Sequence, residues 1–95
     1  MIVNNKISKI SIHQAAILYK DGIWSLPRPA RHHHIINHMA TCLGLDHIPY
    51  SDMVQGFVDG HGEFFNREQA AKRALRILQV KELKAPPDLY SEELW

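Results

Sequence analysis

This 95-residue chain contains one pattern twice: an Asp-Gly turn sequence between two apolar runs. Apolar residues at 10–19 and 23–26 flank Lys20-Asp21-Gly22, and residues 54–58 and 63–65 flank Asp59-Gly60-His61-Gly62. Glycine tolerates the positive φ that tight hairpin turns require. Each turn with its flanking runs therefore predicts a β-hairpin.

The segment after the first hairpin has helical features. Pro27 and Pro29 end the second strand, because proline lacks the N–H that a sheet needs, and Pro29 is tolerated in the first turn of a helix. We expect a helix over residues 29–43, with Gly44 as its C-terminal cap. The apolar stripe of this helix is Ile35, Ile36, Met39, Cys42 and Leu43.

A second helix is expected after the second hairpin. Asn66 and Gln69 have the spacing of a capping box, which predicts a helix over residues 67–78. Its expected inward side chains are Ala70, Ala71, Ala74, Leu75 and Leu78. The order ββα-ββα predicts a small α+β fold, with a mostly antiparallel sheet covered by two helices.

Length and composition exclude several classes of protein. The length fits a single domain over residues 1–95, and Ala85-Pro86-Pro87 leaves residues 85–95 as a short extended tail. No apolar run approaches ~18 residues, and one cysteine cannot form an internal disulfide. We therefore expect a cytoplasmic protein rather than a membrane or disulfide-stabilised one.

Charge is balanced overall but segregated along the chain. The net charge is +1, so the basic excess of a protein that coats nucleic acid is missing, and a nucleic-acid partner is not expected. Residues 1–34 and 67–84 are basic, whereas residues 35–66 and 85–95 are acidic. Such blocks either neutralise one another within the fold or present a basic surface to an anion.

The start of the first helix breaks a local rule. Acidic residues are favoured at a helix N-terminus, yet Arg28, Arg31 and the histidines at 32–34 occupy this one. A phosphate or carboxylate ligand would offset these charges. The alternative partner is an acidic segment of the same chain, such as Glu92-Glu93.

The histidines of this helix have different expected roles. His32 falls on the apolar stripe and is expected in the core, whereas His33 is expected at the surface near a ligand. His34 and His38 are four residues apart, a spacing that can chelate a metal, but Arg31 on the same face disfavours a cation. We therefore expect neither a metal site nor a cofactor.

The same imidazoles are candidate catalysts. His33, His34 and His38 could act as acid and base in cleaving a phosphodiester without a metal, since an ordinary histidine pKa allows both roles at neutral pH. That activity needs a geometry that no sequence spacing establishes. Cys42 lies on the apolar stripe, so we expect a buried thiol rather than a nucleophile.

Further basic and aromatic residues extend the candidate ligand site. Arg67 places a second arginine at a helix start, and Trp24 or Tyr90 could stack on a base. Trp95, the last residue of the sequence, is expected to dock in a groove of its own chain or of a second subunit. The expected ligand-binding residues are thus Arg28, Arg31, His33, His34, Arg67, Trp24 and Tyr90.

The sequence resembles a family of short proteins encoded by bacteriophages and prophages. Four blocks carry the resemblance: 25–36 (SLPRPARHHHII), 55–59 (QGFVD), 62–71 (GEFFNREQAA) and 89–95 (LYSEELW). The resemblance implies a role in the cytoplasm of an infected bacterium and carries no firm activity. Small phage proteins of this kind often counter host defences, some by trapping or destroying nucleotide signals.

These observations favour binding over catalysis. We expect an accessory phage protein that sequesters a nucleotide or cyclic nucleotide and so counters host antiviral defence. Such a protein would enclose its ligand best as a homodimer or higher oligomer. The alternatives are a metal-independent, histidine-based phosphodiesterase that destroys a nucleotide signal, and an inhibitor that binds a host defence protein. The sequence does not select the ligand or the defence system.

Overall fold

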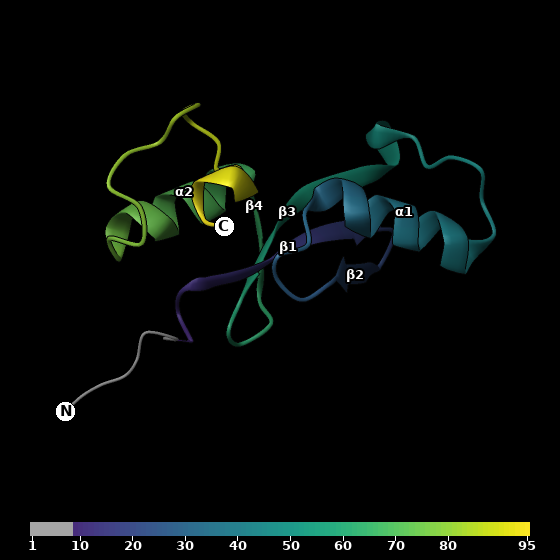
Figure 1. Ribbon diagram of the computed structural model, residues 1–95, viewed down its shortest axis with the longest axis horizontal. Helices are drawn as coiled ribbons and strands as arrows, with labels where there is room; N and C mark the ends of the chain where they lie inside the picture. The colour runs from purple at the N-terminus through teal and green to yellow at the C-terminus, as the bar shows by residue number, and fades with distance from the viewer. Residues whose placement is uncertain (1–8) are drawn as a thin grey trace.

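The two hairpins join into one four-stranded antiparallel sheet, in a computed structural model that describes residues 9–95 (Figure 1). The strand order is β2-β1-β3-β4. The bounds are β1 Ile12–Tyr19, β2 Gly22–Ser25, β3 Met53–Asp59 and β4 Phe64–Asn66. β1 and β3 are central and pair along their whole length, with one register shift between Ile12 and Gln14. The predicted α+β fold is confirmed.

Both helices pack on one face of this sheet. They are α1, His32–Leu43, and α2, Arg67–Arg76. Alternate strand residues face them and form the core with buried helix side chains: Ala15, Ile17, Met53 and Phe57 from the strands, and Ile35, Met39, Ala70, Ala71 and Ala74 from the helices. The remaining strand positions point to the opposite side of the sheet, which we call the outer face.

The helix caps follow from local sequence. Asn66 Oδ1 accepts a hydrogen bond from the Gln69 main-chain N–H at 2.8 Å, and Gln69 Oε1 accepts one from the Asn66 N–H at 2.9 Å. Gly44, with φ of 69°, ends α1 in the left-handed conformation that glycine favours. Both predicted caps are confirmed.

The predicted start of α1 at Pro29 is wrong by one turn. Pro27 to Ala30 form a separate turn, closed by a hydrogen bond from the Ala30 N–H to the Pro27 carbonyl at 3.1 Å, and Arg31 is extended. The predicted burial of Cys42 and Leu43 is also wrong. The last turn of α1 lies beside the tip of the first hairpin, where both side chains are exposed, so the buried stripe ends at Met39.

The predicted end of α2 is two residues too late. Leu78 adopts a left-handed φ of 61°, and the Gln79 N–H turns back to the Ala74 carbonyl at 2.8 Å, which stops the helix at Arg76. This turn directs the Leu78 side chain outward, where it is 80% exposed, so its expected inward position is wrong.

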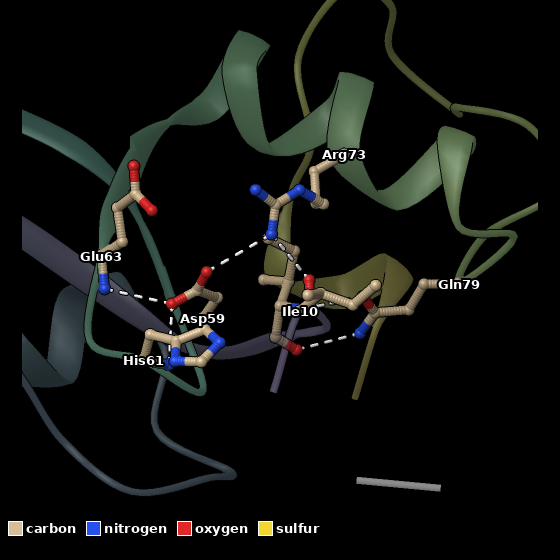
Figure 2. A network of polar contacts seen from close by, with 7 residues as sticks. Ile10, Asp59, His61, Glu63, Arg73 and Gln79 are labelled. Carbon is tan, nitrogen blue, oxygen red and sulfur yellow. Dashed lines mark hydrogen bonds and ion pairs between the residues drawn. The ribbon is translucent and has the colours of Figure 1, made fainter. Parts of the chain in front are cut away.

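A polar network joins α2 to the sheet (Figure 2). Arg73 Nη1 donates to Asp59 Oδ2 at 3.3 Å and to the Ile10 carbonyl at 2.9 Å, while the main-chain N–H groups of His61 and Glu63 donate to Asp59 Oδ1. Burial alone would raise the pKa of Asp59, but these donated hydrogen bonds hold it below its usual value. The network therefore fixes the second hairpin turn against α2.

The C-terminal segment returns to the core. Leu89 is fully buried, and a short 3-10 turn, η2, spans Ser91–Glu93. Glu93 accepts hydrogen bonds from the main-chain N–H groups of Lys84 and Tyr90, at 2.9 and 3.0 Å. Figure 1 shows this segment beside α2, with the chain end close to the helix.

Candidate functional site

The arginines before α1 hold the C-terminal segment. Arg31 Nη1 donates to Ser91 Oγ at 2.9 Å, and Arg31 Nη2 donates to the main-chain oxygen of Trp95. The Arg28 guanidinium lies 4.4 Å from the centre of the Trp95 ring and donates to the carbonyls of His13 and Ile12, at 2.6 and 2.8 Å. We call Arg28, Arg31, Ser91 and Trp95 the tail clamp.

Trp95 docks on its own chain, which is one of the two expected outcomes. Its indole N–H donates to the Ala30 carbonyl at 3.2 Å, and its ring meets the Phe57 ring edge-on at 6.4 Å between centroids. The basic helix start thus receives oxygen atoms from the same chain, but not from the acidic side chains that the internal alternative named. These oxygen atoms belong to Ser91 and Trp95, because the Glu93 carboxylate is occupied by main-chain N–H groups.

Arg67 lies at the other side of the same segment, at the first position of α2. Its Nη1 donates to the Leu89 carbonyl at 3.0 Å, and its Nη2 donates to Gln55 Oε1 at 2.6 Å. The Tyr90 ring covers the guanidinium at 4.4 Å. Within residues 9–95, the ion pairs are Lys72–Glu68 and Arg73–Asp59, so no carboxylate side chain pairs with Arg67. Burial lowers the pKa of Arg67, and Tyr90, Asp88 and Glu92 partly offset that effect.

A buried histidine, His32, contacts the Arg67 guanidinium. His32 is 7% exposed, and its Nε2 lies 2.7 Å from the Gly56 carbonyl, to which it donates. Its Nδ1 is then free to accept from Arg67 Nη2, at 3.4 Å. Burial lowers the pKa of His32 to about 4, and the nearby Arg67 charge acts in the same direction. His32 is therefore a neutral core residue, as expected.

A surface cavity opens in front of Arg67. It has a volume of about 600 Å³, and we call it the Arg67 pocket. Its wall contains Met53, Val54, Gln55, Asn66, Arg67, Glu68, Asp88 and Tyr90. Three of these residues, Asn66 to Glu68, form the start of α2, where main-chain N–H groups and the helix dipole favour an anion.

The other expected site residues lie elsewhere. The His33 and His34 rings lie 4.0 Å apart between centroids, tilted by 42°, on the exposed side of α1, and His34 Nδ1 accepts from the Arg31 main-chain N–H at 2.8 Å. Trp24 meets the His38 ring edge-on at 6.1 Å. The structure thus separates the seven expected ligand-binding residues: Arg28 and Arg31 lie in the tail clamp with His34 bonded to Arg31, Arg67 and Tyr90 lie at the pocket, and His33 and Trp24 belong to neither group.

The histidines named in the catalytic and metal alternatives lie on the exposed side of α1. His33, His34 and His38 line none of the four cavities described for this chain. His38 Nε2 instead lies 3.5 Å from the exposed Cys42 Sγ. Among the side chains described, no three His, Cys, Asp or Glu residues are grouped to hold a metal ion.

Sequence reasoning missed four polar residues of the pocket wall: Gln55, Asn66, Glu68 and Asp88. Gln55 occupies an inward position of β3, between Met53 and Phe57, where alternation predicts an apolar residue. A polar side chain at that position was the available indication. A second cavity of about 570 Å³ was also missed; it lies at the Asp59–Gly62 turn, with His13, Gln14 and Arg28 in its wall.

The comparison with known families agrees with the resemblance seen in the sequence. The family described as phage T4 y16D protein matches residues 11–95, which is most of the chain and includes the tail clamp and the Arg67 pocket. This chain belongs to the phage T4 y16D protein family. No curated protein and no solved structure matches it. In the part of this y16D-family protein that the structure describes, no helix is long and apolar enough to span a membrane.

Proposed function

We propose that this y16D-family protein binds a nucleotide or cyclic nucleotide in the Arg67 pocket and acts by sequestering it. One observation carries the proposal: a half-buried arginine without a carboxylate side-chain partner among residues 9–95 faces a cavity of about 600 Å³. A buried cation without a counter-ion is unfavourable, and a phosphate would supply the missing charge.

The rest of the pocket suits the remainder of a nucleotide. Tyr90 is 39% exposed, so part of its ring remains available to stack on a base. The amide groups of Gln55 and Asn66 can bond base edges, and the carboxylates of Glu68 and Asp88 can accept from ribose hydroxyls. Those two carboxylates would also repel bare phosphate, so we expect nucleotides to bind more tightly than inorganic phosphate.

The biological context is the second half of the proposal. A phage protein that holds a nucleotide signal without turning it over would counter host antiviral defence in the bacterial cytoplasm. Tight trapping requires a ligand enclosed on several sides, and a second subunit could contribute to that enclosure. The phosphodiesterase alternative predicts a different product, since the ligand would be recovered cleaved.

The direct test is calorimetric titration with mono-, di- and cyclic nucleotides. We expect Arg67→Gln to weaken binding at least tenfold, as charge-assisted hydrogen bonds of ~1.5–3 kcal/mol are lost. Tyr90→Ala should weaken it by a similar factor, since base stacking contributes ~1–3 kcal/mol. The matched control is Arg76→Gln, which removes an exposed arginine from the same helix outside the pocket. Equal affinities for all four proteins would refute the pocket assignment.

A further inference from the structure

The outer face of the sheet is unlike a solvated surface. Strand alternation directs ten residues of β1 to β4 to this face, and none of them is charged, although 22% of the chain is. Six are apolar: Ile23 and Val54 are exposed, Leu18 and Phe64 are half-buried, and Ala16 and Val58 are already covered by their neighbours within the chain. The open side of an antiparallel sheet normally carries polar and charged residues.

Three further residues on this face are polar, and each is bonded within the chain. Ser25 Oγ donates to Gln14 Oε1 at 3.1 Å and to the Ala15 carbonyl at 2.7 Å. Asn66 Oδ1 is occupied by the N-cap bond to Gln69. Removing water from this face would therefore leave few polar groups without a hydrogen-bond partner.

The apolar side chains form a continuous row across the sheet. The register places Ile23 of β2 beside Leu18 of β1, and Leu18 beside Val54 of β3. Ile23 is 49% exposed and Val54 is 43% exposed, and both lie outside the core cluster formed with the helices. An exposed apolar row of this kind marks an interaction surface rather than a core.

We infer that the outer face packs against the outer face of a second copy of this chain, giving a two-fold symmetric dimer. A second copy presents a face that is equally uncharged, so no charge is buried on either side. It also has the same strand twist, which lets two sheets pack about 10 Å apart with strands within ~30° of parallel. A partner with ordinary surface charge would have to bury that charge against Leu18 and Val54.

The size of the face sets the expected strength of the dimer. Four strands at a spacing of about 4.8 Å, the central ones about seven residues long at ~3.3 Å each, make a face of at most roughly 450 Å². This is smaller than the ~800 Å² per partner of a standard interface, so we expect dissociation in the micromolar range. The chain should therefore change from monomer to dimer as its concentration rises. Val54 and Asn66 of this face also line the Arg67 pocket, whereas Ile23 and Leu18 do not, so the Ile23 variant tests the dimer without changing the pocket.

Sedimentation velocity across a concentration series tests the inference. The native chain should shift from its 10.9 kDa monomer to twice that mass, with a midpoint between about 1 and 100 µM. Val54→Lys and Ile23→Lys should each remain monomeric over the same range. Leu78→Lys is the matched control, because it also places a charge at an exposed apolar residue but away from the outer face, and it should dimerise normally.

Two results would overturn the inference. A native chain that stays monomeric at several hundred micromolar would mean that another molecule covers the face, or none. Dimers of unchanged affinity in both lysine variants would place the interface elsewhere. Circular dichroism melting of each variant keeps these outcomes distinct from unfolding, and substitutions at two exposed side chains should leave the melting temperature nearly unchanged.

Discussion

The tail clamp and the Arg67 pocket are both built around arginine side chains, but these arginines have different surroundings. In the clamp, Arg28 and Arg31 donate to oxygen atoms of the chain itself and to the Trp95 segment. At the pocket, Arg67 donates to Leu89 and Gln55 but also faces a cavity. The difference is that the clamp arginines hold the end of the tail, whereas Arg67 stands at a helix start beside a cavity whose wall also offers Tyr90 and the side-chain amides.

The largest expected loss of stability comes from a substitution in the tail clamp. Trp95→Ala removes the ring that packs on Arg28 and Phe57, and we expect the free energy of unfolding to fall by about 3 kcal/mol. Urea denaturation measures this loss. Trp95→Phe keeps an aromatic ring and should lose less than half as much. A loss below ~0.5 kcal/mol for Trp95→Ala would mean that the segment is not held as described.

We expect acid to lower the free energy of unfolding by protonating His32, the buried histidine that contacts Arg67. The pKa of His32 is about 4 in the folded chain, against 6.5 when unfolded, so the unfolded chain binds more protons between these values. Stability is then complete above pH 6.5 and falls as the pH drops towards 4, by roughly 2–3 kcal/mol.

Urea midpoints measured at several pH values would show this decline. The control is His32→Gln, whose amide can donate to Gly56 and accept from Arg67 without titrating. This variant should have a flatter profile between pH 4 and 6.5. A profile identical to that of the native chain would show that another group is responsible.

The smallest expected loss of stability, that of Arg31→Ala, distinguishes the tail clamp from the Arg67 pocket most clearly. Arg31→Ala should lower the free energy of unfolding by about 1–2 kcal/mol, because it removes the hydrogen bonds to Ser91 and Trp95. It should leave nucleotide affinity within twofold of the native value. Paired denaturation and calorimetry check both parts. A large loss of nucleotide binding would instead place Arg31 in the ligand site, as the sequence pattern first indicated.

Local features of the fold were predictable from sequence, because their causes are local. Hairpin turns follow from Asp-Gly pairs, and the caps of α1 and α2 follow from Gly44 and from Asn66 with Gln69. The helix ends were less predictable. The start of α1 depends on the Pro27–Ala30 turn, and the end of α2 depends on a left-handed leucine that no propensity favours.

The partners of the arginines were not predictable, because they are distant in sequence. Arg31 and Trp95 are separated by 64 residues, and Arg67 and Gln55 are brought together by the pairing of β3 with β4. Charge patterning identified a basic helix start in need of oxygen atoms. It could not show that the tail would supply them, or that a cavity would form at Arg67.

The most direct test of the central claim is native mass spectrometry of the untagged protein, isolated from infected bacteria and then mixed with a nucleotide panel. The account predicts an adduct with the mass of an intact nucleotide on the native chain, retained by Arg76→Gln and lost in both Arg67→Gln and Tyr90→Ala. A bare chain, both as isolated and after addition of the panel, would contradict the assignment of the Arg67 pocket as a nucleotide site.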